Sequence, residues 1–326
     1  MDSVTLTILT PPEPGAIAVL QVAATDAASL EQAASRAAIP APPVGSLRLA
    51  SIAGVDLGVI TRWTDTTLHL MPHAGPAVIQ EIVRRLEAVG VTLVRPESLD
   101  PRTLYPEAAD HIEARMLWAL SQAASPLAID LLLDQPRRWR LPESTSDPAR
   151  DRILNRLITP PTIAALGPPN IGKSTLCNAL AGRSVAIVAD EPGTTRDHVG
   201  VMIEVGGLVV RYIDTPGMTT LGSRPGAPRE ESDAVAITRR ALESAHLVLC
   251  CGDATAGPLD LPGTLGPVAG ALTLALRADL GSADFPRDLD IAAATGEGIE
   301  RLGDAIRERL VPREAMEATG PWRFWR

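Results

Sequence analysis

The sequence predicts an α/β protein whose C-terminal half contains a mixed, mostly parallel sheet with helices on both faces. Two observations carry this prediction: a glycine-rich loop joins an apolar strand to a helix near residue 170, and further apolar strands follow it. A third observation, the pair Pro160-Pro161, marks a linker before this half. We therefore expect an N-terminal α/β domain at 1–105, a reduced helical segment at 106–158, the loop-bearing domain at 159–312 and a C-terminal tail at 313–326.

Composition limits the classes of protein to consider. The 326 residues are 45% hydrophobic and 21% charged, which is typical of a globular chain and excludes disordered, collagen-like and coiled-coil proteins. No apolar stretch approaches the roughly 18 residues of a membrane helix. Three cysteines form neither a disulfide framework nor a metal-ligand spacing, so we expect a cytoplasmic protein. The net charge of −9 argues against a broad phosphate-binding surface.

In the first domain, short β-like runs alternate with two predicted helices, at Ala28–Ala38 and Ala77–Ala88. This pattern indicates a mixed or mostly antiparallel sheet. Residues 107–157 read as largely helical, with interruptions at four prolines, Pro126, Pro136, Pro142 and Pro148.

The loop near residue 170 contains Lys173, the single lysine among 30 basic residues. Gly167, Gly172, Lys173 and Ser174 match the pattern G-x-x-x-x-G-K-[ST], between a strand at Thr162–Leu166 and a helix after it. Glycines let backbone N–H groups turn toward a phosphate, and lysine reaches phosphates where a planar guanidinium would clash. We expect the following to bind phosphate: Gly167, Asn170, Ile171, Gly172, Lys173, Ser174 and Thr175.

Other segments supply ligands for Mg²⁺, which prefers oxygen. The Ser174 hydroxyl is one candidate ligand. Thr195, which lies 22 residues after Lys173 (195 − 173), is a second and can close over the ion, with Thr194 as the alternative. A hairpin, Val199–Val205 and Leu208–Ile213 around two glycines, leads to Asp214, a third candidate ligand. Gly217 can offer its N–H to a γ-phosphate and move when that phosphate leaves.

The group that assists hydrolysis is less obvious. Met218 follows Gly217 and cannot orient a water molecule. Asn170 has two readings: its carbonyl oxygen holds a monovalent cation beside the phosphates, or the residue only caps a turn. Asn170, Lys173, Thr195 and Gly217 are our candidate catalytic residues.

Base recognition departs from the usual pattern. Leu276, Arg277, Ala278 and Asp279 stand where N-K-x-D reads guanine. Asp279 can still accept from the guanine edge through charged bonds worth roughly 1.5–3 kcal/mol each, so we expect guanine preference to weaken about tenfold rather than disappear. Ala293 and the backbone that follows it, up to Gly298, are expected beside the base, before a closing helix at Ile299–Leu310.

These motifs, in this order, resemble a P-loop GTPase domain, and Pro192–Asp197 resembles the Era and MnmE (TrmE) branch of GTPases. Three segments before the domain are similar to the MnmE family: Thr7–Leu20, Leu68–Val78 and Glu107–Arg115. The resemblance implies a GTPase that binds GTP or GDP with Mg²⁺ and works with a partner enzyme to modify the wobble uridine of tRNA. It also implies a potassium ion at Asn170, a homodimer formed through the N-terminal domain, and a bound formyl-folate.

The sequence departs from the family in places. Glu13-Pro14 replaces the basic turn, and Glu97–Tyr105 is shorter than the family's motif there, which argues against folate binding. The sequence ends at Pro321–Arg326, without the family's cysteine-containing tail, so we expect a shortened and divergent member. Two other functions stay open: a regulatory GTPase switch without tRNA chemistry, and an Era-like ribosome-assembly GTPase.

Three further groups have two readings each. The family's catalytic glutamate would correspond to Glu230, Glu231 or Asp233, although capping of the next helix explains these acids better. His69 and His73 share a face of a possible strand and could be ligands, but packing or exposure is the favoured reading. The aromatic residues Trp322, Phe324 and Trp325 could anchor the tail, with a frayed end as the favoured reading.

Overall fold

The computed structural model describes residues 4–10, 15–141, 145–182, 200–215, 233–258 and 270–325, with the backbone alone for 233–237. The chain forms two compact units, residues 1–118 and 119–326, which are treated separately below. The domain boundaries expected at 105/106 and 158/159 stay predictions. No helix within the described ranges is long and apolar enough to span a membrane.

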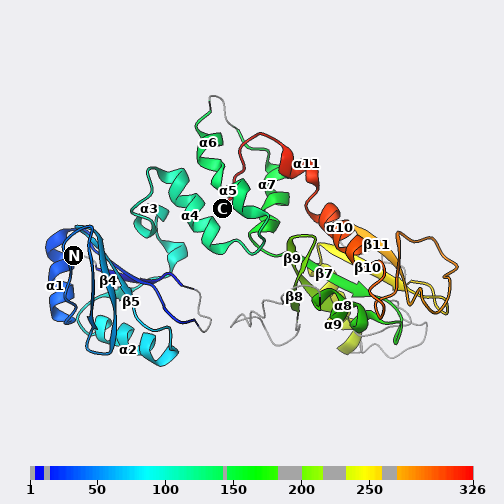
Figure 1. The fold of residues 1–326 in the computed structure, drawn as a ribbon, viewed down its shortest axis with the longest axis horizontal. Helices are drawn as coiled ribbons and strands as arrows, with labels where there is room; N and C mark the ends of the chain where they lie inside the picture. Colours follow the sequence, from blue (N-terminus) through cyan, green and yellow to red (C-terminus); the bar gives the residue numbers. More distant parts are fainter. Residues whose placement is uncertain are drawn as a thin grey trace. The chain divides into compact units, whose positions relative to one another are not determined.

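The first unit is built on a six-stranded sheet in the order β3-β4-β5-β2-β1-β6. Figure 1 shows this unit with α1 and α2 beside the strands. Neighbouring strands are antiparallel except β1 and β6, which are parallel, so the expected mixed sheet is confirmed. The strands are β1 (Thr5–Ile8), β2 (Leu20–Ala23), β3 (Leu47–Ile52), β4 (Asp56–Thr64), β5 (Thr67–Met71) and β6 (Thr92–Leu93).

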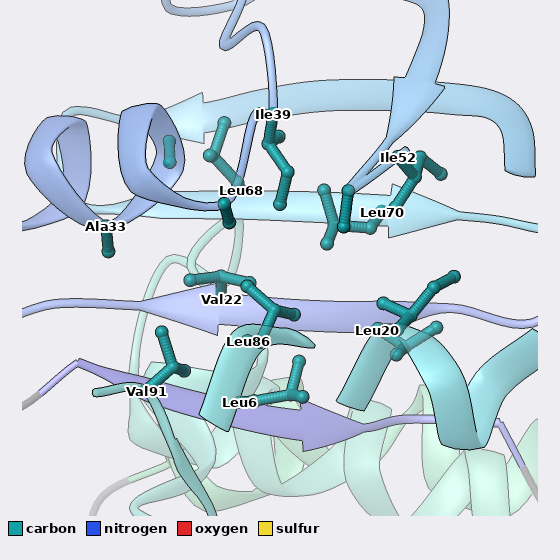
Figure 2. Packing of buried hydrophobic residues seen from close by; sticks show 14 of the residues in the cluster. Leu6, Leu20, Val22, Ala33, Ile39, Ile52, Leu68, Leu70, Leu86 and Val91 are labelled. Carbon is teal, nitrogen blue, oxygen red and sulfur yellow. The ribbon is translucent and has the colours of Figure 1, made fainter. Parts of the chain in front are cut away.

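Two helices cover the apolar face of this sheet. Helix α1 (Ala27–Arg36) begins after Asp26, whose carboxylate accepts from the Ser29 N–H at 2.9 Å, and α2 (Pro76–Glu87) begins with a proline. Every second residue of a strand packs against the helices, because successive side chains in a strand point to opposite faces of the sheet. Figure 2 shows the resulting core, which includes Leu6, Leu20, Val22, Ala33, Ile39, Ile52, Leu68, Leu70, Leu86 and Val91. Both helices predicted here are confirmed.

Short helices follow. They are α3 (Pro101–Leu104), α4 (His111–Gln122), α5 (Ala128–Leu133), α6 (Gln135–Trp139) and α7 (Pro148–Leu154), with 3₁₀ turns at Pro96–Ser98 and Asn155–Leu157. Prolines stand in the first turns of α6 and α7, where their missing N–H costs nothing.

The C-terminal segment is not a frayed end, and the favoured sequence-based reading is wrong. After α11 (Arg313–Glu317) the chain lies against α6 and α7. Trp322 is fully buried; its backbone N–H donates to Gln135 Oε1 at 2.7 Å and its indole N–H to Asn155 Oδ1 at 3.0 Å. The alternative reading, that the aromatic residues anchor the tail, is therefore the correct one.

Arg150 of α7 secures the same segment through backbone carbonyls. Its Nε donates to Ala315 O at 2.7 Å, and its terminal nitrogens donate to Ala318 O and Gly320 O, each at 2.8 Å. Hydrogen bonds from a charged donor are stronger than neutral ones. Because the acceptors are backbone atoms, sequence patterns give no sign of this attachment.

The second unit contains a six-stranded sheet in the order β12-β11-β10-β7-β9-β8. All neighbours are parallel except the hairpin β8–β9, as the sequence predicts, and Gly206 and Gly207 form its turn with φ of 56° and 82°. The strands are β7 (Thr162–Leu166), β8 (Val201–Val205), β9 (Leu208–Asp214), β10 (Leu247–Gly252), β11 (Ala271–Leu276) and β12 (Leu289–Ile291).

Helices pack on both faces of this sheet. Helix α9 (Asp233–Ser244) places Leu242 against Leu166 and Val248, while α8 (Lys173–Ala181) and α10 (Ile299–Leu310) contact each other and β8. The closing helix has the bounds that the sequence predicts. Since parallel strands end at one edge of a sheet, the loops after β7, β9, β10 and β11 gather there.

Candidate nucleotide-binding site

The loop at residues 167–172 joins β7 to α8 along a path that few residue types allow. Asn170 and Gly172 have φ of 62° and 104°, in the left-handed region that asparagine and glycine enter most readily. At Gly167 a Cβ atom would lie 2.3 Å from the Cys251 carbonyl oxygen, so the position has no room for a side chain. The predicted order of strand, loop and helix is confirmed. The backbone of Asn170 fits the turn reading of that residue.

Lys173 is the first residue of α8, and its side chain runs back under the loop. The residue is only 6% exposed, and its Nζ donates to Gly167 O at 3.1 Å and to Pro168 O at 2.9 Å. Burial lowers the pKa of Lys173, while the carboxylate of Asp214 acts in the opposite direction. These contacts hold the ammonium group in one place inside the loop.

Ser174 and Asp214 meet beside the lysine. The Ser174 hydroxyl donates to Asp214 Oδ2 at 2.5 Å, and Asp214 stands at the end of β9 in register with Ala165 of β7. The next residue, Thr215, donates its hydroxyl hydrogen to the Ala165 carbonyl at 2.6 Å, which ties the end of β9 to β7. A hydroxyl and a carboxylate in contact are the oxygen donors that Mg²⁺ prefers, so the donor set fits that ion.

An open cavity of about 590 Å³ lies over these groups. Six predicted site residues line it: Asn170, Gly172, Lys173, Ser174, Thr175 and Asp214. Two other predicted residues have different places, since Ile171 is 2% exposed and Gly167 lies against Cys251 at the base of the loop. The structure thus brings six of the predicted phosphate-binding and metal-binding residues to one cavity.

The predicted base-reading positions are the last residue of β11, Leu276, and the three residues that follow it. Leu276 is 3% exposed, and its register partner in β12 is Ile291, so its side chain belongs to the core. Arg277 adopts a left-handed backbone with φ of 54° and forms an ion pair with Asp253. Asp279 is exposed two residues later. The sequence analysis missed Asp253, although an acid directly after the buried strand β10 was a usable signal.

Ala293 and the backbone after it form a compact turn between β12 and α10. The Ala292 carbonyl accepts from the N–H groups of Thr295 at 3.1 Å and Gly296 at 2.9 Å. Ala293 itself is half-buried. Its expected place beside a base stays a prediction.

Several predicted site residues lie outside the described residues. These are Thr194, Thr195, Gly217, Met218, Glu230 and Glu231, while Asp233 begins α9 with only its backbone described. Their roles remain predictions from the sequence.

His69 and His73 lie in the first unit in different surroundings. His69 is 8% exposed, accepts from the Trp63 indole N–H at 2.8 Å, and has its pKa lowered to about 4 by burial. His73 is exposed and contacts Asp56. Across the described ranges, no group of three or more His, Cys, Asp or Glu side chains could hold a metal ion. The favoured reading of the pair is packing or exposure; the structure shows His69 buried and His73 exposed.

One protein-family model matches part of the second unit, and solved structures with a low TM-score are also similar to the chain. Residues 162–267 match the protein family described as 50S ribosome-binding GTPase. Over 46% of its length the chain is also similar to Era from Aquifex aeolicus, with 25% identity, 56% of that chain covered and a TM-score of 0.34.

Three of the similar sequences are described as tRNA modification GTPase MnmE. The protein of Acidiphilium cryptum is 41% identical over 45% of this chain and 32% of its own length. That of Hyphomonas neptunium is 29% identical over 95% of this chain and 81% of its own length, and that of Azorhizobium caulinodans is 30% identical over 76% and 65%. The chain therefore matches less than two thirds of several relatives, and its strongest similarity is local.

Proposed function

Because the chain belongs to the MnmE family as a divergent member, we propose that it binds GTP and GDP with Mg²⁺ and hydrolyses GTP to GDP and phosphate. One observation carries the proposal: Lys173, Ser174 and Asp214 converge on a cavity bounded by a glycine loop and the start of a helix. Backbone N–H groups and the positive end of α8 attract phosphate, and the buried ammonium adds a full charge.

Different groups would bind the ion and the nucleotide. Ser174 and Asp214 hold Mg²⁺ or its water shell, with Thr195 as a further ligand when a γ-phosphate is present. Gly217 donates its N–H to that phosphate. The bound ion supplies charge neutralisation for the phosphates; orientation of the nucleotide comes from Lys173 and the loop backbone.

Hydrolysis is slow, since Met218 cannot orient the attacking water. Asn170 supports a potassium ion beside the phosphates, a role favoured by its position in the lining of the cavity. Turnover measured in KCl and in NaCl at equal ionic strength tests this role. Equal rates in the two salts would remove it.

The family relationship extends the proposal to modification of the wobble uridine of tRNA, in the cytoplasm and with a partner enzyme. Dimerisation through the N-terminal unit follows from the same relationship, which in one relative covers 95% of this chain. Analysis of wobble uridines in a deletion strain tests the role in tRNA. We expect the wobble uridines to be unmodified in the deletion strain and modified again when the wild-type gene is supplied. Normal modification in the deletion strain would favour a regulatory switch. Binding of the protein to ribosomal subunits would favour an Era-like role.

The first test of nucleotide binding uses a fluorescent GDP analogue and two substitutions at one position, Lys173→Ala and Lys173→Arg. Both should weaken binding by at least about 100-fold, because the ammonium makes charge-assisted bonds worth roughly 1.5–3 kcal/mol each and a guanidinium does not fit under the loop. The melting temperature of each variant serves as the control for folding. Wild-type protein without affinity for GTP or GDP, or a folded variant with wild-type affinity, would overturn the proposal.

A further inference from the structure

The base end of the proposed nucleotide site, at the end of β11, lacks the side chain that the motif N-K-x-D would place first. Leu276 offers no polar atom, and its 3% exposure and pairing with Ile291 fix it in the core. A base at this end must therefore be supported by other residues. The candidates within the described ranges are the residues that follow β11 and the loop that follows β10.

Arg277 occupies a conformation that needs support. A non-glycine residue with φ of 54° sits in a sparsely populated region, at a cost of about 1 kcal/mol. The aliphatic part of its side chain passes beside the phosphate loop: a Cβ atom placed on Gly172 would lie 3.8 Å from the Cγ of Arg277. The guanidinium, with a side chain 39% exposed, is thus held between the loop and solvent.

Asp253 provides that support from a different strand. Its side chain is 2% exposed, and Oδ1 accepts from the Thr255 N–H at 2.8 Å, the Thr255 hydroxyl at 2.7 Å and the Ala256 N–H at 3.0 Å. The remaining oxygen, Oδ2, pairs with Arg277. A carboxylate fixed by three donors is already oriented before it meets the arginine, so little freedom is lost when the pair forms.

The surrounding backbone makes this arrangement rigid. Gly252 leaves no room for a side chain, because a Cβ there would lie 2.7 Å from Pro258 N and 2.9 Å from Ala256 O. The Leu280 N–H donates to Arg277 O at 2.9 Å, which closes the turn that carries Asp279. A Cβ at Gly281 would lie 3.2 Å from the Ala254 Cβ, so the two loops touch.

We propose that Asp253 is a positioning residue for nucleotide binding, which holds Arg277 against the phosphate loop as a flat support for the purine whose edge Asp279 reads. A guanidinium plane stacks on a base without regard to the groups on its edge. Affinity at this end then depends on the Asp253–Arg277 pair, and selectivity depends on Asp279. The inference rests on the proposed nucleotide site.

The test compares Asp253→Asn with Asp290→Asn. The first substitution keeps an oxygen for Thr255 and Ala256 but removes the charge that faces Arg277; the second removes the partner of Arg287 in β12. With full-length protein we expect Asp253→Asn to weaken GDP and IDP by the same factor, about tenfold, with turnover at saturating GTP unchanged. Asp290→Asn should bind both nucleotides like the wild type.

Two further variants separate positioning from a structural effect. In an Arg277→Met background, which keeps the stem and removes the guanidinium, Asp253→Asn should cause no additional loss of affinity. Asp279→Ala should instead change the ratio of GDP to IDP affinity, because IDP lacks the 2-amino group. Wild-type affinity in Asp253→Asn, additive losses in the double variant, or a fall in turnover at saturation would overturn the inference. Each of these results leaves the proposed function intact, provided that the wild-type protein binds GDP.

Discussion

The phosphate end and the base end of the proposed nucleotide site are built from different kinds of groups. At the phosphate end, the proposed binding groups are backbone N–H groups, one lysine and the start of a helix, all within residues 167–175. At the base end, the groups are side chains from separate strands, Asp253 after β10 and Arg277 and Asp279 after β11. The phosphate end keeps every residue of its motif, and the base end keeps one acid.

This difference has a physical cause. A backbone cradle depends on φ angles and on close contacts that a single methyl group disrupts, so few sequences satisfy it. A base can be held by edge bonds, by stacking, or by both, so a lost amide at residue 276 can be offset by a fixed guanidinium. We expect substitutions at the phosphate end to have large effects and those at the base end to have small ones.

The largest effect is expected for Gly167→Ala. Its Cβ would lie 2.3 Å from the Cys251 carbonyl, so the ends of β7 and β10 must move apart and the loop must follow. Overpacking of this kind costs about 1–3 kcal/mol of stability, and we expect nucleotide affinity to fall by about 100-fold. Calorimetric binding and thermal unfolding measure the two effects.

Gly257→Ala is the matched control for that substitution, since nothing lies within 4 Å of its Cβ. It should bind nucleotide and unfold like the wild type. If Gly167→Ala had the same affinity and stability as Gly257→Ala, the phosphate end would tolerate substitution as well as the base end does, which would contradict the difference proposed between them.

A smaller effect is expected for Ser174→Ala, which removes the hydroxyl that contacts Asp214. Affinity for GDP should fall about tenfold with Mg²⁺ present, the value of one bond to a charged group, and should match the wild type in EDTA. Ser244→Ala, which removes a hydroxyl that donates to the Ala241 carbonyl at 3.0 Å within α9, is the control. An equal loss in EDTA would mean that Ser174 acts on the nucleotide directly and not through the ion.

How much could be read from the sequence follows the same division. The phosphate loop, the hairpin around Gly206-Gly207 and the helix Ile299–Leu310 were predicted because their signals lie within a few consecutive residues. Asp253 was missed because its partner is 24 residues away, and the attachment of Trp322 because its partners lie in α6 and at Asn155, after α7. Contacts between distant side chains and backbone atoms leave no periodic pattern.

The smallest effect is expected for Leu276→Asn, which restores the first residue of the base-reading motif. The new amide can add neutral hydrogen bonds worth roughly 0.5–1.5 kcal/mol, so GDP affinity should rise by no more than about tenfold. The same amide enters a position that is 3% exposed, and an unsatisfied buried polar group costs about 1–3 kcal/mol, so the melting temperature should fall.

Leu276→Met, which keeps an apolar side chain of similar volume, separates the two contributions and should change neither property appreciably. Competition of GDP and ADP against a fluorescent nucleotide measures the gain in guanine preference. A 100-fold gain in Leu276→Asn would mean that the base end depends on one side chain as strongly as the phosphate end depends on Lys173. In that case the Asp253–Arg277 pair would not compensate for the missing asparagine, and affinity at both ends of the site would depend on a single side chain.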